Sequence, residues 1–597
     1  MVSFMTPERG GIEVQRRGPT AARRRAATRV KWGVALGLLF AFNFEPGHLV
    51  VAGLYGDDAS YFAHATTIAL DFDLDYSNEH FQVWNAARTI AAHPIGAGVL
   101  AAPFVGLFGV IDRITHHPII HDHEKLQYSW SYFGFLFAAN FYFFLGVFLF
   151  WRGVRRLEPE LDIRWNLLLA AGTGVVYYVL RQFTMAHAFE FAALGLVFWA
   201  SAGLYDAFRE RKRIAGWVLL CGLGISLSLA IRNSNLVVMV LPHAVLLCFH
   251  LMRGRGGILE PRQLRSALGI VSVAAAAAYL PIALFNLHFY GTVFPSVIAR
   301  YGYDVKGLAA ASAWTLATGS LRLVPNLVPL LFSSEFGLVF TNPVLVIGCT
   351  ALIVLTFHDS LTRRNGVAHL AGWVFLGVVA FSVAVVLWWR TTASSYGYRY
   401  LFPLYPFALL GFALLLRRVA DRGASRPCIR RAFSSAVVSL CAVAFISQLF
   451  FGVNERLSTR NTVNVFGVLH TYSAKGYLTN LLGEIARPET WVRLAATRYA
   501  GFLAGPIVIH TSLYERIAEA DRDKYERRFG HVPWTVYLQT LLLFAGWVAV
   551  GVVVGSVVTR APPTRPAPAI DVTPRARLDG ERSARAHRAG QAGRNVV

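Results

Sequence analysis

Long apolar runs alternate with short polar stretches along most of the chain, from about residue 32 to residue 558. Most of these runs approach the roughly 20 residues that an α-helix needs to cross the hydrocarbon core of a bilayer. Backbone groups find no water partner in that core, so spanning segments must satisfy their hydrogen bonds internally. The pattern predicts an all-α polytopic membrane protein with about 12 transmembrane helices.

The first predicted span covers residues 32–54 and the last covers 535–558. Ten others lie between them, at approximately 129–150, 165–181, 187–207, 215–231, 235–252, 266–289, 338–357, 367–388, 403–417 and 433–452. The apolar run 94–111 is left out, because counting it would place Arg152, Arg155 and the basic clusters that follow on the outer side, against the usual cytoplasmic bias of Lys and Arg. We therefore predict that 94–111 lies in the outer interface and that both termini are cytoplasmic.

This topology divides the chain into five parts, of which the transmembrane module is the largest. The parts are a basic cytoplasmic tail (1–31), a transmembrane module (32–452) with a first outward loop at 55–128, an outward loop or small helical cap (453–534), a last span (535–558) and a disordered cytoplasmic tail (559–597). The basic tail and the apolar run that follows it read together as an uncleaved signal anchor. Catalytic chemistry is expected in the outward segments.

Composition agrees with a membrane protein, because only 15% of the residues are charged while 55% are hydrophobic. The formal net charge of +23 could suggest a nucleic-acid partner. The basic residues, however, lie between apolar runs, so we read them as topological charges and predict no nucleic-acid binding. The five cysteines form no pattern that indicates a zinc site or a disulfide framework.

The clearest chemical feature is the adjacent pair Asp57 and Asp58 at the outer end of the first span. Close carboxylates repel, so one of them can act as a base on an acceptor hydroxyl or bind a divalent cation. The alternative is that Asp57 only caps the helix that follows. Further along, His64 lies in a predicted surface helix, and His93-Pro94 opens the interfacial run. The acidic stretch 71–79 reads as a solvated turn.

The order of these features resembles membrane glycosyltransferases of the GT-C superfamily, such as protein O-mannosyltransferases and the aminoarabinose transferase of lipid A. The shared features are a basic tail, one span, Gly56-Asp57-Asp58, a surface helix, His93-Pro94 before an interfacial helix, and a span that ends in Arg-rich sequence. The resemblance covers roughly residues 30–420 in topology. This chain has Asp-Asp where some members have Asp-Glu, and His-Pro-Ile-Gly where they have a His-Pro-Pro pattern.

The resemblance implies transfer of a sugar from a polyprenyl-phosphate donor to a glycan, lipid or protein of the cell envelope. It places the active site on the outer side of the cytoplasmic membrane, with Asp57 as the catalytic carboxylate and Asp58 as its helper. No cofactor is implied with certainty, although a divalent cation, Mg²⁺ or Mn²⁺, held by the acidic loop is compatible with it.

Charged and aromatic residues at the outer ends of other spans are candidates for substrate binding. His187 and Glu190 are three residues apart, and Arg232 follows an apolar run, where a cation is costly unless it meets an anion. Tyr398 and Arg399 could contact a sugar and a phosphate. The alternatives are interhelical hydrogen bonds for His187 and an aromatic belt around Tyr398. His64, His93 and Glu335 complete the predicted substrate-binding set.

The sequence thus favours a lipid-phosphate-dependent glycosyltransferase. A transporter or flippase of a lipid-linked anion remains open, because it would use the same arginines without needing Asp57 as a base. A non-enzymatic scaffold of the envelope is a third class. The run 115–124 is rich in His and acidic residues but matches no zinc signature, so we read it as a hydrated loop.

Overall fold

The structure of the chain is a computed structural model. It describes residues 19–44, 57–79, 91–115, 129–157, 161–209, 213–235, 261–294, 338–361, 399–423, 427–451 and 534–559, with a few single positions besides. The predictions for Glu335, Tyr398, the run 116–128, the spans at 235–252 and 367–388, most of 453–534 and the C-terminal tail lie outside these residues.

All regular elements among the described residues are helical. The α-helices are α1 (Pro19–Asn43), α3 (Asp57–Thr66), α4 (Gly96–Ile114), α5 (Trp130–Leu157), α6 (Ile163–Ala171), α7 (Val175–Leu180), α8 (His187–Arg209), α9 (Ala215–Ile231), α11 (Pro261–Tyr290), α15 (Leu338–Thr341), α16 (Pro343–Leu361), α18 (Tyr405–Gly423), α19 (Pro427–Phe451) and α26 (Trp534–Val558). A π-helix, η1 (Thr67–Asp71), follows α3, and two 3₁₀ helices are η3 (Asn233–Asn235) and η6 (Arg399–Leu404).

Seven helices in the described part are long and apolar enough to cross a membrane, which confirms the prediction of an all-α polytopic membrane protein. Helices α5, α8, α11, α18, α19 and α26 fall on predicted spans. Helix α4 also meets these criteria of length and composition. Its predicted place in the outer interface therefore stays a prediction.

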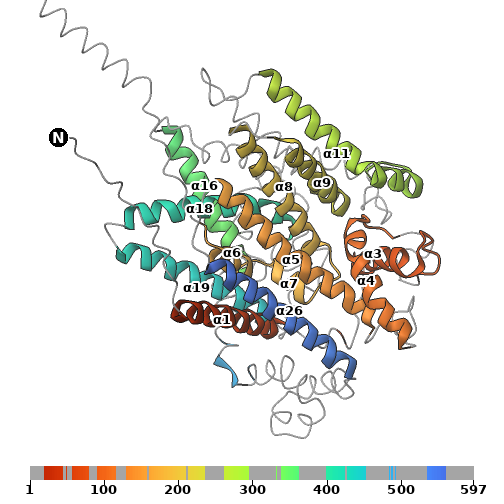
Figure 1. Cartoon of the computed structure of the whole chain (residues 1–597), viewed down its shortest axis with the longest axis horizontal. Helices are drawn as coiled ribbons and strands as arrows, with labels where there is room; N and C mark the ends of the chain where they lie inside the picture. Colours follow the sequence, from red (N-terminus) through yellow and green to blue (C-terminus); the bar gives the residue numbers. More distant parts are fainter. Residues whose placement is uncertain are drawn as a thin grey trace, which may run out of the picture.

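The bundle is built around α5, which packs between α4 and α8. Figure 1 shows α11, α9, α8 and α5 as a row across the molecule, with α3 and α4 beside one end of α5. Aromatic side chains fill the contacts around α5. One example is Phe143, whose ring stacks on Phe191 of α8 with centroids 5.6 Å apart. This packing brings the N-terminal ends of α3, α4 and α8 and the C-terminal end of α9 into one region.

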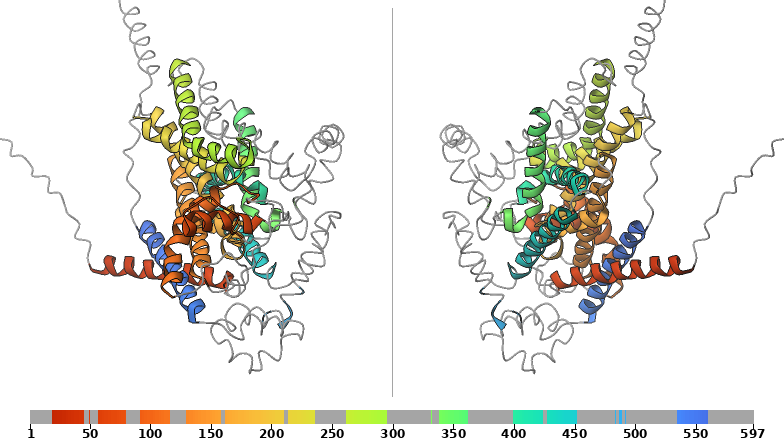
Figure 2. Two further views of the ribbon diagram at one scale, coloured as in Figure 1. Left: turned by 90° about the vertical axis from the view of Figure 1, so that its right-hand side faces the viewer. Right: turned by 90° about the vertical axis from the view of Figure 1, so that its left-hand side faces the viewer.

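Helix α1 begins at Pro19, before the predicted start of the first span, and ends at Asn43. It packs antiparallel on α26, because Gly37 faces Phe544 while Gly555 faces Arg29. Figure 2 shows α1 crossing α26, with its N-terminal end projecting beyond the bundle. Small residues at a helix crossing let two backbones approach closely. The N-terminal end of α1 and the C-terminal end of α26 consequently lie on the same side of this pair.

Two predicted spans are interrupted rather than continuous. The span predicted at 165–181 is divided into α6 and α7 by a turn at Gly172 to Gly174, and the span predicted at 338–357 breaks at Asn342 between α15 and α16. The two breaks meet, since the Gly174 N–H donates to Oδ1 of Asn342 at 2.7 Å. A side-chain amide thus replaces a hydrogen bond that a continuous helix would have made within itself.

Helix α5 is capped by a carboxylate from α4. Oδ1 of Asp112 accepts the Trp130 N–H at 2.8 Å, and Oδ2 accepts the Ser131 N–H at 2.7 Å, while the Asp112 side chain is fully buried. These donors have no acceptor within the helix, since they belong to its first turn. Asp112 therefore joins the end of α4 to the start of α5.

We expect Asp112→Ala to lower the free energy of unfolding by about 1–2 kcal/mol, because two buried N–H groups lose their acceptor. The apparent melting temperature of the detergent-purified protein measures this. Asp75→Ala is the control, since Asp75 is exposed and caps only a surface turn. Equal melting temperatures for the two variants would contradict a capping role.

Candidate functional site

The adjacent carboxylates lie in the first turn of α3, where the partial positive charge of a helix N-terminus favours acidic side chains. Oδ1 of Asp57 lies 3.1 Å from Nε2 of His93. The His93 side chain is 7% exposed and that of Asp57 is 30% exposed. The imidazole therefore holds the carboxylate from the protein side while part of Asp57 stays accessible to a ligand.

Asp58 has a different environment from Asp57. It is buried and lies within electrostatic reach of the Tyr132 hydroxyl at the start of α5. Because Asp58 is turned into the protein, we expect it to orient the start of α3 rather than to contact a substrate.

His64 connects α3 to the loop that carries His93. Its Nε2 lies 2.8 Å from the His93 carbonyl oxygen, and its Nδ1 lies 2.6 Å from the Tyr76 hydroxyl. Burial raises the pKa of Tyr76, so the phenol stays protonated. A carbonyl can only accept, so His64 donates a hydrogen bond from Nε2, and its Nδ1 accepts one from the Tyr76 hydroxyl. His64 is fully buried and so supports the His93 backbone, whereas the sequence suggested contact with substrate.

Two glycines at the start of α4 bring this loop against neighbouring backbone. A Cβ added to Gly96 would lie 2.6 Å from both the Ala230 carbonyl oxygen and the Ile231 nitrogen, at the end of α9. A Cβ on Gly98 would lie 3.0 Å from the Tyr61 carbonyl oxygen in α3. The absence of side chains at these positions allows α3, α4 and α9 to meet, with His93 on one side of the contact and Arg232 on the other.

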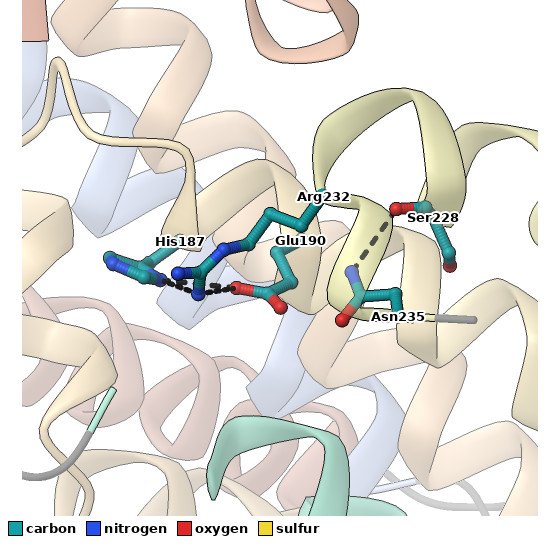
Figure 3. Close-up of polar contacts among 5 residues, drawn as sticks. All are labelled: His187, Glu190, Ser228, Arg232 and Asn235. Carbon is teal, nitrogen blue, oxygen red and sulfur yellow. Dashed lines mark hydrogen bonds and ion pairs between the residues drawn. The ribbon is translucent and has the colours of Figure 1, made fainter. Parts of the chain in front are cut away.

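A second cluster of charged residues lies beyond that contact (Figure 3). Nη1 of Arg232 donates to Oε2 of Glu190 at 3.2 Å, and Nδ1 of His187 lies 3.1 Å from the same oxygen. The Glu190 and His187 side chains are 1% and 3% exposed, and that of Arg232 is 14% exposed. The buried carboxylate thereby holds one nitrogen of the guanidinium that follows the end of α9.

Aromatic rings surround His187 and bring the predicted Arg399 segment to the same region. The His187 ring centroid lies 4.4 Å from that of Tyr178 and 5.5 Å from that of Phe402. Phe402 belongs to η6, whose first residue is Arg399. The backbone of the Arg399 segment therefore lies beside the Arg232 cluster, as phosphate binding by both arginines would require.

The structure thus groups five of the predicted site residues into two connected clusters: Asp57 with His93, and Arg232 with Glu190 and His187. Sequence reasoning missed Tyr76, Gly96 and Asn235 as site residues. The signal for Gly96 was its place two residues after His93-Pro94, where a small residue permits a close approach. Within the described part of the chain, no three His, Cys, Asp or Glu side chains come together as metal ligands.

No protein-family model and no curated protein match this sequence. The solved structures that are similar to it include the oligosaccharyltransferase of Archaeoglobus fulgidus, crystallised with Zn and sulfate. That match has 16% identity and a TM-score of 0.37 and covers 74% of this chain. The chain spans 58% of the length of that oligosaccharyltransferase.

ArnT from Cupriavidus metallidurans is also similar, with 15% identity and a TM-score of 0.36 in two structures. The match to the apo structure covers 89% of this chain and 78% of ArnT. The match to the structure bound to undecaprenyl phosphate covers 85% of this chain and 87% of ArnT. All these TM-scores are below 0.5, so the similarity carries no argument about the activity of this chain.

Proposed function

We propose that this protein is a membrane glycosyltransferase that moves a sugar from a polyprenyl-phosphate donor to an envelope glycan, lipid or protein. The observation that carries the proposal is the Gly96 contact between α4 and α9. This contact packs the loop that carries His93, the partner of the partly accessible Asp57 carboxylate, against the end of α9 that precedes Arg232. Glycosyl transfer from a lipid phosphate needs these two functions, a base for the acceptor and a cation for the leaving group.

The proposed reaction is a direct displacement at the anomeric carbon. The acceptor hydroxyl gives its proton to the Asp57 carboxylate while its oxygen forms the new bond to that carbon. The bond from the anomeric carbon to the phosphate oxygen breaks, and the polyprenyl phosphate leaves with the electron pair. Arg232, together with Arg399, offsets the charge of the leaving phosphate, and His93 holds Asp57 in place. An outward-facing site in the cytoplasmic membrane is part of this proposal.

The test is a transfer assay on the purified full chain in lipid nanodiscs, with a set of polyprenyl-phosphate sugars and envelope-type acceptors. A glycosyltransferase releases polyprenyl phosphate and forms a glycosylated acceptor. A flippase moves the intact lipid in proteoliposomes and releases none. Movement without release would overturn the proposal in favour of the transporter.

Arg232→Lys should reduce turnover by about 10- to 100-fold although it keeps the charge. Lysine cannot offer the planar fork that binds two phosphate oxygens, and hydrogen bonds to charged groups contribute about 1.5–3 kcal/mol. Lysine is preferable to alanine for the kinetic measurement, because removing the cation would leave the buried Glu190 carboxylate without its partner. The measurement is turnover together with the Kd for polyprenyl phosphate. If the Kd for polyprenyl phosphate were unchanged in both Arg232→Lys and Arg232→Ala, Arg232 would not be a phosphate-binding residue.

A further inference from the structure

The two oxygens of the Glu190 carboxylate have different surroundings. Oε2 accepts hydrogen bonds from Arg232 and His187, whereas Oε1 accepts none from the residues that the structure describes. In Figure 3 the carboxylate lies below the Arg232 side chain, and its second oxygen is turned toward Asn235. One acceptor of the cluster is therefore left for another donor.

Asn235 supplies a second acceptor of the same kind. It lies in η3, three residues after Arg232, and its N–H donates to the Arg232 carbonyl oxygen at 3.0 Å. Its Nδ2 donates to the Ser228 carbonyl oxygen at 3.1 Å, which fixes the amide orientation. Its Oδ1 is buried and has no hydrogen-bond partner in the described part of the chain. A buried acceptor left in this state costs about 1–3 kcal/mol, so a donor group is expected there when the site is filled.

The chemistry of these two oxygens defines what they can bind. Both are acceptors, so they repel the oxygens of a phosphate and attract a group that carries hydrogen-bond donors. Oε1 belongs to the carboxylate that pairs with Arg232, and Asn235 donates its N–H to the Arg232 carbonyl, so a cation with the opposite preference lies in the same cluster. Such an arrangement suits a ligand in which an anionic group and a hydroxyl- or amine-bearing group are directly joined.

We propose that Oδ1 of Asn235 and Oε1 of Glu190 form a subsite for a hydroxyl or amino group of the donor sugar. The inference rests on the proposed function, since it assumes a sugar linked to the phosphate beside Arg232. Asn235 is then a specificity-determining residue that recognises the sugar and leaves the lipid phosphate to the arginines. Removing one neutral hydrogen bond of this kind weakens binding by about 2- to 10-fold.

Equilibrium binding to the full chain in nanodiscs tests the inference, with three probes: polyprenyl phosphate without sugar, a polyprenyl-phosphate hexose, and hexose donors that each lack one hydroxyl. Asn235→Ala should weaken binding of the hexose donor about 2- to 10-fold and leave the sugar-free lipid phosphate unchanged. One of the deoxy donors should bind the variant and the unmodified protein equally.

Ser228→Ala is the matched control, because Ser228 lies near the end of α9 and accepts the Asn235 hydrogen bond at its backbone carbonyl, which alanine keeps. It should bind all probes like the unmodified protein. Equal weakening of sugar-free and sugar-bearing probes in Asn235→Ala would overturn the inference, as would unchanged binding of every probe. Should Asn235→Ala fail to fold, the deoxy series on the unmodified protein decides, since equal binding of every deoxy donor excludes the subsite.

These binding results are separate from the test of the proposed function. If the unmodified protein binds the hexose donor more tightly than the sugar-free lipid but transfers nothing, the glycosyltransferase proposal fails while the Asn235 subsite stands. If transfer occurs but Asn235→Ala does not distinguish the probes, the subsite fails alone.

Discussion

Asp57→Asn is expected to reduce sugar transfer by about 10²- to 10⁴-fold, the usual contribution of a general base. The amide keeps the size of the side chain and can still hydrogen bond to Nε2 of His93, but it cannot take a proton from an acceptor hydroxyl. Initial rates of polyprenyl phosphate release measure the loss, and donor affinity should stay within about twofold of the unmodified protein.

Asp75→Asn is the control for this substitution. Asp75 lies in the turn that follows η1 and is exposed. The hydrogen bond from Ser77 lowers its pKa, so it is charged at neutral pH like other exposed carboxylates. Its replacement should leave transfer unchanged. A loss of less than about 10-fold in Asp57→Asn would instead favour the capping role that the sequence left open. A normal transfer rate would remove Asp57 from the mechanism.

Gly96→Ala should have the largest effect on the architecture of the site. The added methyl group would meet the backbone of Ala230 and Ile231, which cannot turn away as a flexible side chain could. We expect a loss of about 1–3 kcal/mol in stability, as in other overpacked contacts, and a fall in transfer rate because His93 and Arg232 move apart. Thermal unfolding and the transfer assay together measure it.

Gly106→Ala provides a control in the same helix. A Cβ at Gly106 would lie 3.4 Å from the Ala69 side chain, which is ordinary van der Waals contact. Alanine also favours helix over glycine by up to about 1 kcal/mol, so this variant should be at least as stable as the unmodified protein. Equal stability and activity of the two glycine variants would show that the α4 to α9 contact does not hold the site together.

The periodicity of the chain was enough to predict most helices, because a bilayer requires about 20 apolar residues for each crossing. Helix α9 has the predicted bounds 215–231, and α26 starts one residue before its predicted start. The breaks at Gly172 to Gly174 and at Asn342 were not predicted. Hydropathy averages over a window, so a local exchange of one backbone hydrogen bond for a side-chain amide leaves little trace in it.

The sequence predicted which residues belong to the candidate site, but it did not predict which of them contact one another. Arg232 stood out because a cation at the end of an apolar run is costly, and Glu190 and His187 because three residues separate them on a helix. That all three meet at one carboxylate oxygen depends on the packing of α8 on α9. No spacing along the chain carries that information, since Arg232 and Glu190 are far apart in sequence.

By itself, the sequence determined the helical membrane architecture and the residues able to carry charge chemistry, since both follow from local composition and hydropathy. Only the tertiary structure decided that Asp57 is held by His93, that His64 supports the His93 backbone, and that α9 brings Arg232 against Glu190. The physical reason is that hydrogen bonds and close backbone contacts between helices depend on distances of a few ångströms. Those distances are set by the packing of residues that are distant in the chain, such as Gly96 and Ala230.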